Sequence, residues 1–260
     1  MYSRSRFNEF DLVESINNHR ISQLNKNLLT FMQTLFGVVD RDEIAYARVL
    51  EGKGKPDIVV KYKDKEKYVS IKSGSAKVFH NCQLTTFIDF LKSQNISEKS
   101  LETIQLFHYA DGTTNGTGAR RMGTEELFES LGDRIKEMNQ ELNADREFIK
   151  KFAEYVMFQG YNPNIKGADA VYLGDYDSGM CTLKEQFIKY FERDKFSWQE
   201  YPHIGPFLFR PHARYTNSEI KRQDRHDIVD VYWPHFDTSI RFIARNYPSF
   251  NVHLKNGNYC

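Results

Sequence analysis

The chain of 260 residues has only three cysteines, Cys82, Cys181 and Cys260, and they lie far apart. This number and spacing exclude a CxxC zinc site and argue against a disulfide framework. Proteins of the reducing cytoplasm use cysteine in this way, so a cytoplasmic location is expected. The eight histidines include no pair at the short spacing of a metal site, which argues against zinc as well.

Long hydrophobic runs are also missing. No stretch approaches the roughly 18 apolar residues of a membrane-spanning helix, and the polar start MYSRSRFNEF does not resemble a signal peptide. The GxGxxG, Walker and GxSxG motifs are absent, which leaves nucleotide-binding and serine-hydrolase chemistry without support. The 40% of hydrophobic and 14% of aromatic residues nevertheless provide enough apolar side chains for a folded core.

The net charge is only +1, but the charges are unevenly distributed. Residues 48–77 carry nine basic and four acidic side chains, and residues 210–225 carry five basic and two acidic ones, whereas nine acids face five bases in 123–154. A protein that offers one face to phosphate groups has this pattern, although solvated strands and helices have it too. The expected DNA contacts lie in the two basic zones and after the Gly/Thr-rich loop at 111–118: Lys53, Lys55, Arg120, Arg121, Arg210, Arg214, Lys221 and Arg222.

The spacing of apolar residues predicts an α/β fold with a mixed β-sheet flanked by helices. The first part, 1–122, is expected to form the core and the second, 123–260, a helical and β-rich α+β region packed on it. Helices are expected over 8–36 (with a possible break at 17–20), 80–92, 124–143, 144–159 and 182–193, and strands over 44–50, 57–62, 68–73, 102–110, 207–215 and 227–233.

The stretch 54-GKPDIVVKYKDKEKYVSIKSGSAKVFH-80 reads as two strands joined by a charged turn. A turn through residues 64–66 would set Asp57 opposite Ser73 and within a residue or two of Lys72. Alternation places Ser70 and Lys72 on one face of the hairpin, while Val69 and Ile71 point to the other face, into the core. A carboxylate and an amine are therefore expected to converge at a strand end.

Such a pair suits hydrolysis of phosphodiester bonds. Mg²⁺ (or Mn²⁺) takes oxygen ligands and keeps several waters, so Asp57, the carbonyl group of Ile71 and one further acid would hold it. A lysine near the phosphate can stabilise the charge that develops there. A surface hairpin with no chemistry is the simpler interpretation of the same residues.

Residues 56-PD-57 with 70-SIK-72 resemble the PD-(D/E)XK nuclease superfamily, which includes many restriction endonucleases and Holliday-junction resolvases. The resemblance implies a restriction-endonuclease-like core, Asp57 as metal ligand and Lys72 as catalytic lysine. Ser70 departs from the motif, because the superfamily usually has Glu or Asp there. A role for Ser70 in orienting the site is expected instead.

The second acid must then come from elsewhere. Glu14 falls on the apolar stripe predicted for the first helix, and some nucleases of this fold place a glutamate of that helix at the metal. A buried carboxylate needs a partner such as a metal ion or a lysine. Glu14 is therefore the first candidate for catalysis and metal binding, with solvent exposure as the alternative; Glu43 and Glu51 follow.

The sequence as a whole predicts a Mg²⁺-dependent DNA endonuclease of restriction type, in a prokaryotic defence or mobile-element context. The expected partner is double-stranded DNA, and cutting both strands with one site per chain implies a homodimer. Two alternatives stay open. One is a DNA-binding protein that kept the nuclease fold without the activity, and the other is an enzyme similar to Holliday-junction resolvases.

Overall fold

The computed structural model describes residues 4–52, 54–72, 78–160, 164–193, 196, 201–212 and 225–247. The chain forms two compact units. Unit 1 comprises Met1–Ala76, Met157–Arg193 and His235–Cys260, and unit 2 comprises Lys77–Val156 and Asp194–Pro234. The units thus interleave along the chain instead of dividing between residues 122 and 123 as the sequence predicts.

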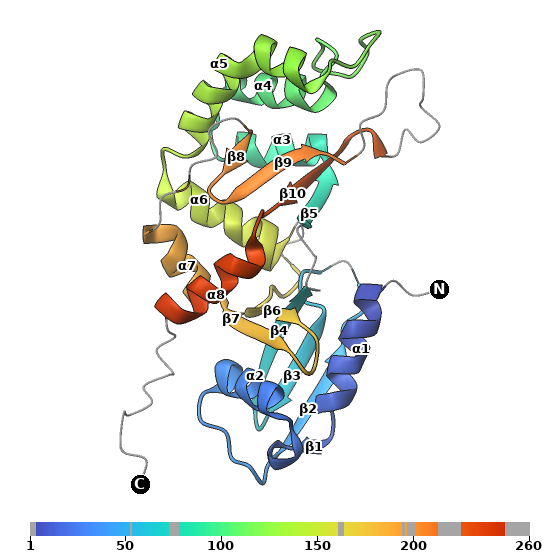
Figure 1. Ribbon diagram of the computed structural model, residues 1–260, viewed down its shortest axis with the longest axis vertical. Coiled ribbons are helices and arrows are strands. Elements are labelled where there is room, and N and C mark those ends of the chain that lie inside the picture. Colours follow the sequence, from blue (N-terminus) through green and yellow to red (C-terminus); the bar gives the residue numbers. More distant parts are fainter. Residues whose placement is uncertain are drawn as a thin grey trace. The chain divides into compact units, whose positions relative to one another are not determined.

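Unit 1 contains a six-stranded mixed sheet in the order β1-β2-β3-β4-β6-β7 (Figure 1). Only β4 and β6 run parallel; every other neighbouring pair is antiparallel. This confirms the predicted class, α/β with a mixed sheet. The strands are β1 (His19–Arg20), β2 (Ile44–Val49), β3 (Ile58–Tyr62), β4 (Lys65–Lys72), β6 (Ala170–Gly174) and β7 (Gly179–Leu183).

The helix predicted over 8–36 is two helices, α1 (Arg4–Ile16) and α2 (Lys26–Phe36). The chain turns at Asn18, whose φ of 61° lies in the left-handed region, and β1 follows. Asn25 then caps α2 by accepting a hydrogen bond from the backbone of Leu28. The expected stop at Gly37, with φ 80°, is confirmed.

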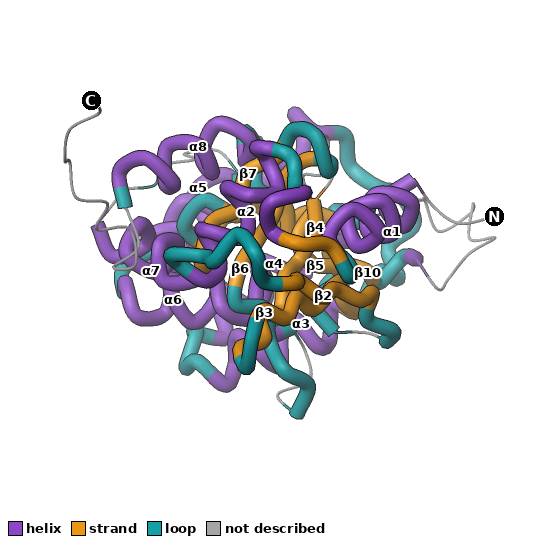
Figure 2. Tube along the Cα trace, turned by 90° about the horizontal axis from the view of Figure 1, so that it is seen from below, coloured by secondary structure: helices purple, strands orange, loops and turns teal. Residues whose placement is uncertain are grey.

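Two later helices complete unit 1. Helices α7 (Lys184–Arg193) and α8 (Phe236–Asn246) lie side by side (Figures 1 and 2) and both contact β7. The rings of Phe187 and Phe236 stack with their centroids 6.1 Å apart, which packs the two helices together. The sheet is therefore covered by helices that come from opposite ends of the chain.

Unit 2 contains a four-stranded antiparallel sheet in the order β5-β10-β9-β8. Its strands are β5 (Val78–Gln83), β8 (His203–Ile204), β9 (Phe207–Pro211) and β10 (Ile228–Tyr232), and its helices are α3 (Leu84–Ser93), α4 (Glu98–Tyr109), α5 (Thr124–Leu142) and α6 (Arg146–Ala153). A π-helical segment, Glu154–Gln159, continues the chain after α6 and passes from unit 2 into unit 1.

Two predictions in unit 2 are wrong. The segment 102–110, predicted as a strand, belongs to α4, which Ser97 caps and which buries Leu101, Ile104 and Phe107 at helical spacing. The segment 80–83, predicted as the start of a helix, is the end of β5, because it pairs with β10 from a distant part of the chain. The predicted helices at 80–92 and 124–143 are otherwise present as α3 and α5.

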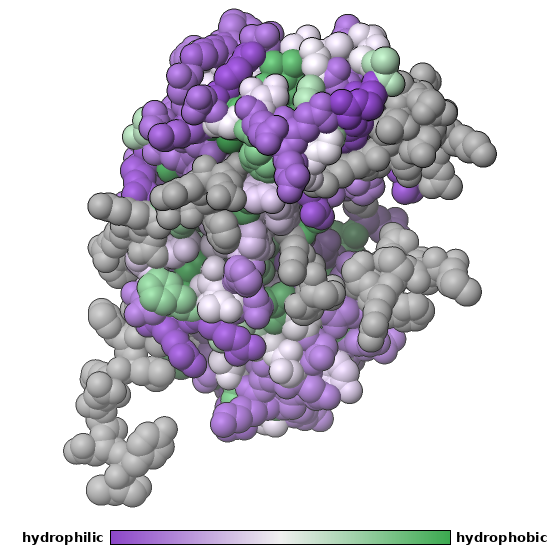
Figure 3. Space-filling view, turned by 45° about the horizontal axis from the view of Figure 1, so that its top comes forward, coloured by the Kyte–Doolittle hydropathy of each residue, from purple (hydrophilic) through white to green (hydrophobic). Residues whose placement is uncertain are grey.

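On the face seen in Figure 3, hydrophobic residues show as separate spots among hydrophilic ones. Among the described residues, no helix combines the length and the apolar character that crossing a bilayer requires.

Candidate active site

The hairpin of β3 and β4 closes through Lys63 and Asp64 rather than through 64–66. Lys63 adopts a left-handed conformation, with φ 52°, which permits this tight two-residue turn. As a result Tyr62 pairs with Lys65, and Ile58 pairs with Val69. The predicted register is therefore wrong: Asp57 faces Ser70, three residues away from Ser73, its predicted partner.

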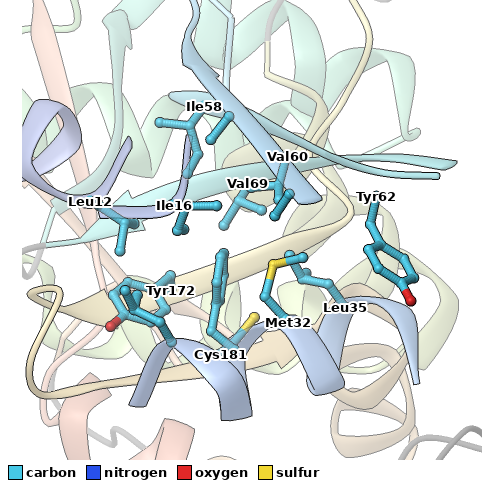
Figure 4. Packing of buried hydrophobic residues seen from close by; sticks show 14 of the residues in the cluster. Leu12, Ile16, Met32, Leu35, Ile58, Val60, Tyr62, Val69, Tyr172 and Cys181 are labelled. Carbon is cyan, nitrogen blue, oxygen red and sulfur yellow. The ribbon is translucent and has the colours of Figure 1, made fainter. Parts of the chain in front are cut away.

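The two faces of β4 are as predicted. Ile58, Val60, Val69 and Ile71 point into the core that α1 and α2 cover, and Figure 4 shows most of these side chains converging there. Alternation turns the side chains of Ser70 and Lys72 to the opposite face. The paired ladder ends at Ile58 and Val69, and the N–H of Asp57, just before β3, also donates a 2.9 Å hydrogen bond to the Val69 carbonyl. The carboxylate of Asp57 lies beside Ser70, whose hydroxyl group donates to it over 3.2 Å.

Asp57 is held by β4 at the point where β3 begins. Its Oδ2 accepts a 2.6 Å hydrogen bond from the backbone N–H of Ile71 and a 3.2 Å bond from the hydroxyl group of Ser70. Ser70 is fully buried, so its hydroxyl needs this acceptor. Burial raises the pKa of Asp57 above its ordinary value, and the charge of Lys72, these two donors and the charge of Lys55 counteract the rise. A nearby cation therefore favours the charged form of this carboxylate.

Of the two lysines, Lys72 has the larger effect on the pKa of Asp57. Burial lowers the pKa of its ammonium group, and the negative charges of Asp57 and then Glu9 oppose the decrease. Each group is thus costly to bury alone, and each stabilises the charged form of the other. Perturbed pairs of this kind gather at functional sites more often than elsewhere.

On α1 the charge of Glu9 acts on Lys72, whereas Glu14 is exposed, so the expected burial of Glu14 is wrong. Leu12 and Ile16 mark the buried face of α1. Glu9 precedes them by three and seven residues and so projects on that face, whereas Glu14 points about 140° away from Glu9 and is exposed. The prediction placed the apolar face on one continuous helix over 8–36. Because the chain turns at Asn18, the buried face of α1 does not follow that continuous pattern.

The oxygen atoms at this site fit a magnesium-type ion. The N–H and C=O groups of one strand residue point to the same side, so the Ile71 carbonyl points to the side of Asp57. Mg²⁺ is usually held by one or two carboxylates with several waters, which Asp57, Glu9 and this carbonyl would satisfy. Among the described residues no group of three or more His, Cys, Asp or Glu side chains gathers, so nothing there resembles a structural zinc site.

The remaining acids proposed for the site lie elsewhere. Glu43 forms an ion pair with Lys63 at the hairpin turn, with 3.6 Å between Oε1 and Nζ. Glu51 is exposed. Asp57, Ser70, Ile71 and Lys72 are therefore the predicted site residues that the structure brings together.

The residues predicted to contact DNA have different surroundings. Lys53, Arg214, Lys221 and Arg222 lie outside the described residues. Lys55 belongs to unit 1, and its charge acts on Asp57.

In unit 2, Arg120 forms a two-pronged ion pair with Glu126, with N–O distances of 2.6 and 2.9 Å. Arg121 donates a hydrogen bond to the carbonyl of Tyr109, and the guanidinium group of Arg210 lies 4.6 Å from the ring centre of Tyr232.

Comparison of the sequence with protein-family models and with curated proteins finds no match to either. The chemistry must therefore be inferred from the residues themselves. Together they combine a carboxylate fixed by two donors, a backbone carbonyl directed to the same side, and an ammonium group. Such a set can hold a divalent cation and stabilise a phosphate group beside it.

Proposed function

We propose that the protein is a Mg²⁺-dependent (or Mn²⁺-dependent) DNA endonuclease of the PD-(D/E)XK type, acting on double-stranded DNA as a homodimer in a restriction-like role. The observation that carries this proposal is the fixed Asp57 carboxylate next to Lys72 at one end of a mixed sheet. The motif residues 56-PD-57 and 70-SIK-72, quoted for the resemblance, are the residues that meet there.

In this proposal each residue has a distinct task. Asp57, Glu9 and the Ile71 carbonyl would hold the metal ion. When bound, the ion would supply a water of lowered pKa and neutralise charge on the phosphate oxygens. Lys72 stabilises the negative charge that develops on the phosphate during attack. Ser70 donates to Asp57 and fixes the orientation of its carboxylate.

A non-catalytic DNA-binding protein is the second candidate, and Ser70 favours it. The position that usually supplies an acid holds a fully buried hydroxyl group, so the two strands contribute one carboxylate instead of two. A junction-resolving enzyme would use the same residues and differ only in the shape of its substrate.

Cleavage of supercoiled plasmid with Mg²⁺ or Mn²⁺ tests the proposal. Wild type and a Lys63→Ala control, altered at the exposed hairpin turn, should cut, whereas Asp57→Ala, Lys72→Ala and wild type in EDTA should not. A wild type that shifts DNA in a gel but leaves it intact would favour the binding protein. Cleavage confined to four-way junctions would indicate a resolvase, and fixed fragments from plasmid would indicate sequence-specific cutting.

A further inference from the structure

Most sheet edges in the described part of the chain are short or covered. The edge strands β1 and β8 have two residues each. The edge strand β7 is packed by α2, α7 and α8. Proteins use short or covered edges to prevent pairing with other chains.

Strand β5 is different. It has six residues, VFHNCQ, with no proline and no lysine, arginine, aspartate or glutamate. It forms an edge of the sheet of unit 2, and no described strand pairs with its outer side. The ladder with β10 is regular through Gln83, Cys82, Asn81 and His80, and the irregularity at Val231/Tyr232 lies beyond that stretch.

The ladder determines which backbone groups face outward. Leu84 donates a hydrogen bond to the Asp227 carbonyl, and neighbours in an antiparallel ladder alternate between bonded and non-bonded positions. The N–H and C=O groups of Cys82 and His80 therefore point to β10. Those of Asn81 point to the outer side of β5, away from β10. The side chain of Asn81 is also exposed.

We propose that β5 is a self-association edge, on which a second copy of this chain docks its own β5 in antiparallel orientation. The two-fold axis would pass beside Asn81, so that the two Asn81 residues exchange N–H···O=C bonds and the two sheets become one. An antiparallel pair of identical strands satisfies two-fold symmetry. The absence of charge favours a second copy, because like charges directly opposite each other would oppose pairing.

This inference is independent of the proposed nuclease activity. It rests on the backbone of unit 2. The homodimer was expected because one site per chain cuts one DNA strand, and this inference names the surface through which the two copies would associate.

Sedimentation equilibrium on full-length protein, without DNA or metal, tests it. Wild type should dimerise at concentrations on the order of 10–100 μM. Asn81→Lys alone and Asn81→Glu alone should each be monomeric, because like charges then face each other, whereas an equimolar mixture should recover a dimer of one of each. Gln140→Lys and Gln140→Glu, on an exposed position of α5, are the matched controls and should dimerise as wild type does.

Asn81→Pro provides a variant without added charge. It removes the outward N–H that β10 does not use, so the fold should persist, as circular dichroism would verify, and the dimer should be lost. A monomeric wild type at these concentrations would overturn the proposal, as would single charged variants that dimerise normally. A dimeric but inactive wild type would leave this inference standing and contradict only the nuclease.

Discussion

The backbone N–H of Ile71 lies 2.6 Å from Oδ2 of Asp57 and donates a hydrogen bond to it. β3 begins at Ile58, so at Asp57 a side-chain carboxylate, and not a backbone carbonyl, accepts the next hydrogen bond from β4. The bond fixes the carboxylate against β4, next to Ser70 and two residues before Lys72.

Replacing Lys72 by Met should lower kcat for DNA cleavage by about 10²- to 10³-fold, because the charge that stabilises the transition state is lost. The dissociation constant for DNA, measured without metal, should change little, since Lys72 acts on the phosphate only during attack. Lys65→Met, at the exposed start of β4, is the matched control. Equal loss in both variants would mean that general positive charge matters and Lys72 does not.

Glu9 and Glu14 provide a paired test of the second acid. Glu9→Gln should raise the Mg²⁺ concentration needed for half-maximal cleavage about tenfold or more, because second ligands and outer partners typically contribute that much to metal affinity. Glu14→Gln should behave as wild type, since Glu14 is exposed on another side of α1. The reverse result would restore Glu14 to the site and contradict the orientation of α1.

The dependence of cleavage on pH should show two limbs. Burial raises the pKa of Asp57, so the acidic limb should fall at higher pH than for an ordinary aspartate: the carboxylate is lost as pH decreases through that raised value. Burial lowers the pKa of Lys72, so the alkaline limb should begin below the range of an ordinary lysine. Lys72→Arg, which keeps its proton, should lose the alkaline limb if it cleaves at all. An unchanged alkaline limb in an active Lys72→Arg variant would exclude Lys72 as its origin.

Ser70→Ala should lower the free energy of unfolding by about 1–2 kcal/mol in urea titrations, because a buried hydrogen bond to a carboxylate is removed. The acidic limb of cleavage should also move to higher pH, since a donor that lowers the pKa of Asp57 is lost. Ser93→Ala, where an exposed hydroxyl bonds a helix carbonyl, should change neither quantity. A stable Ser70→Ala variant with an unshifted limb would show that Ser70 does not act on Asp57.

The sequence predicted those elements of the fold that short-range residue patterns determine. Strands β2, β3 and β4 form where β-branched and aromatic residues predicted them, and Gly37 ends α2 as expected. The pairing of β5 with β10 and of β4 with β6 joins segments about 100 residues or more apart, and nothing in either segment specifies its partner. The interleaved units follow from those pairings, so they were not predictable either.

The candidate site was predictable in composition and less so in geometry. Asp57, Ser70, Ile71 and Lys72 meet although the predicted turn was wrong, because alternation keeps Asp57 on the face of Ser70 and Lys72 in the observed register. Glu9 was missed because one helical phase was extended across Asn18. The apolar residues Leu12 and Ile16 alone, read as a separate helix, would have indicated it.

The binding of Mn²⁺ to the metal-free protein, measured by electron paramagnetic resonance, tests the central claim most directly, because it needs neither DNA nor turnover. Wild type should bind about one Mn²⁺ per chain, Mg²⁺ should displace it, and Asp57→Asn should bind none in the same concentration range while remaining folded. Binding by Asp57→Asn with the affinity of wild type would contradict the account, since the metal would then lie away from the carboxylate that Ile71 and Ser70 hold in place.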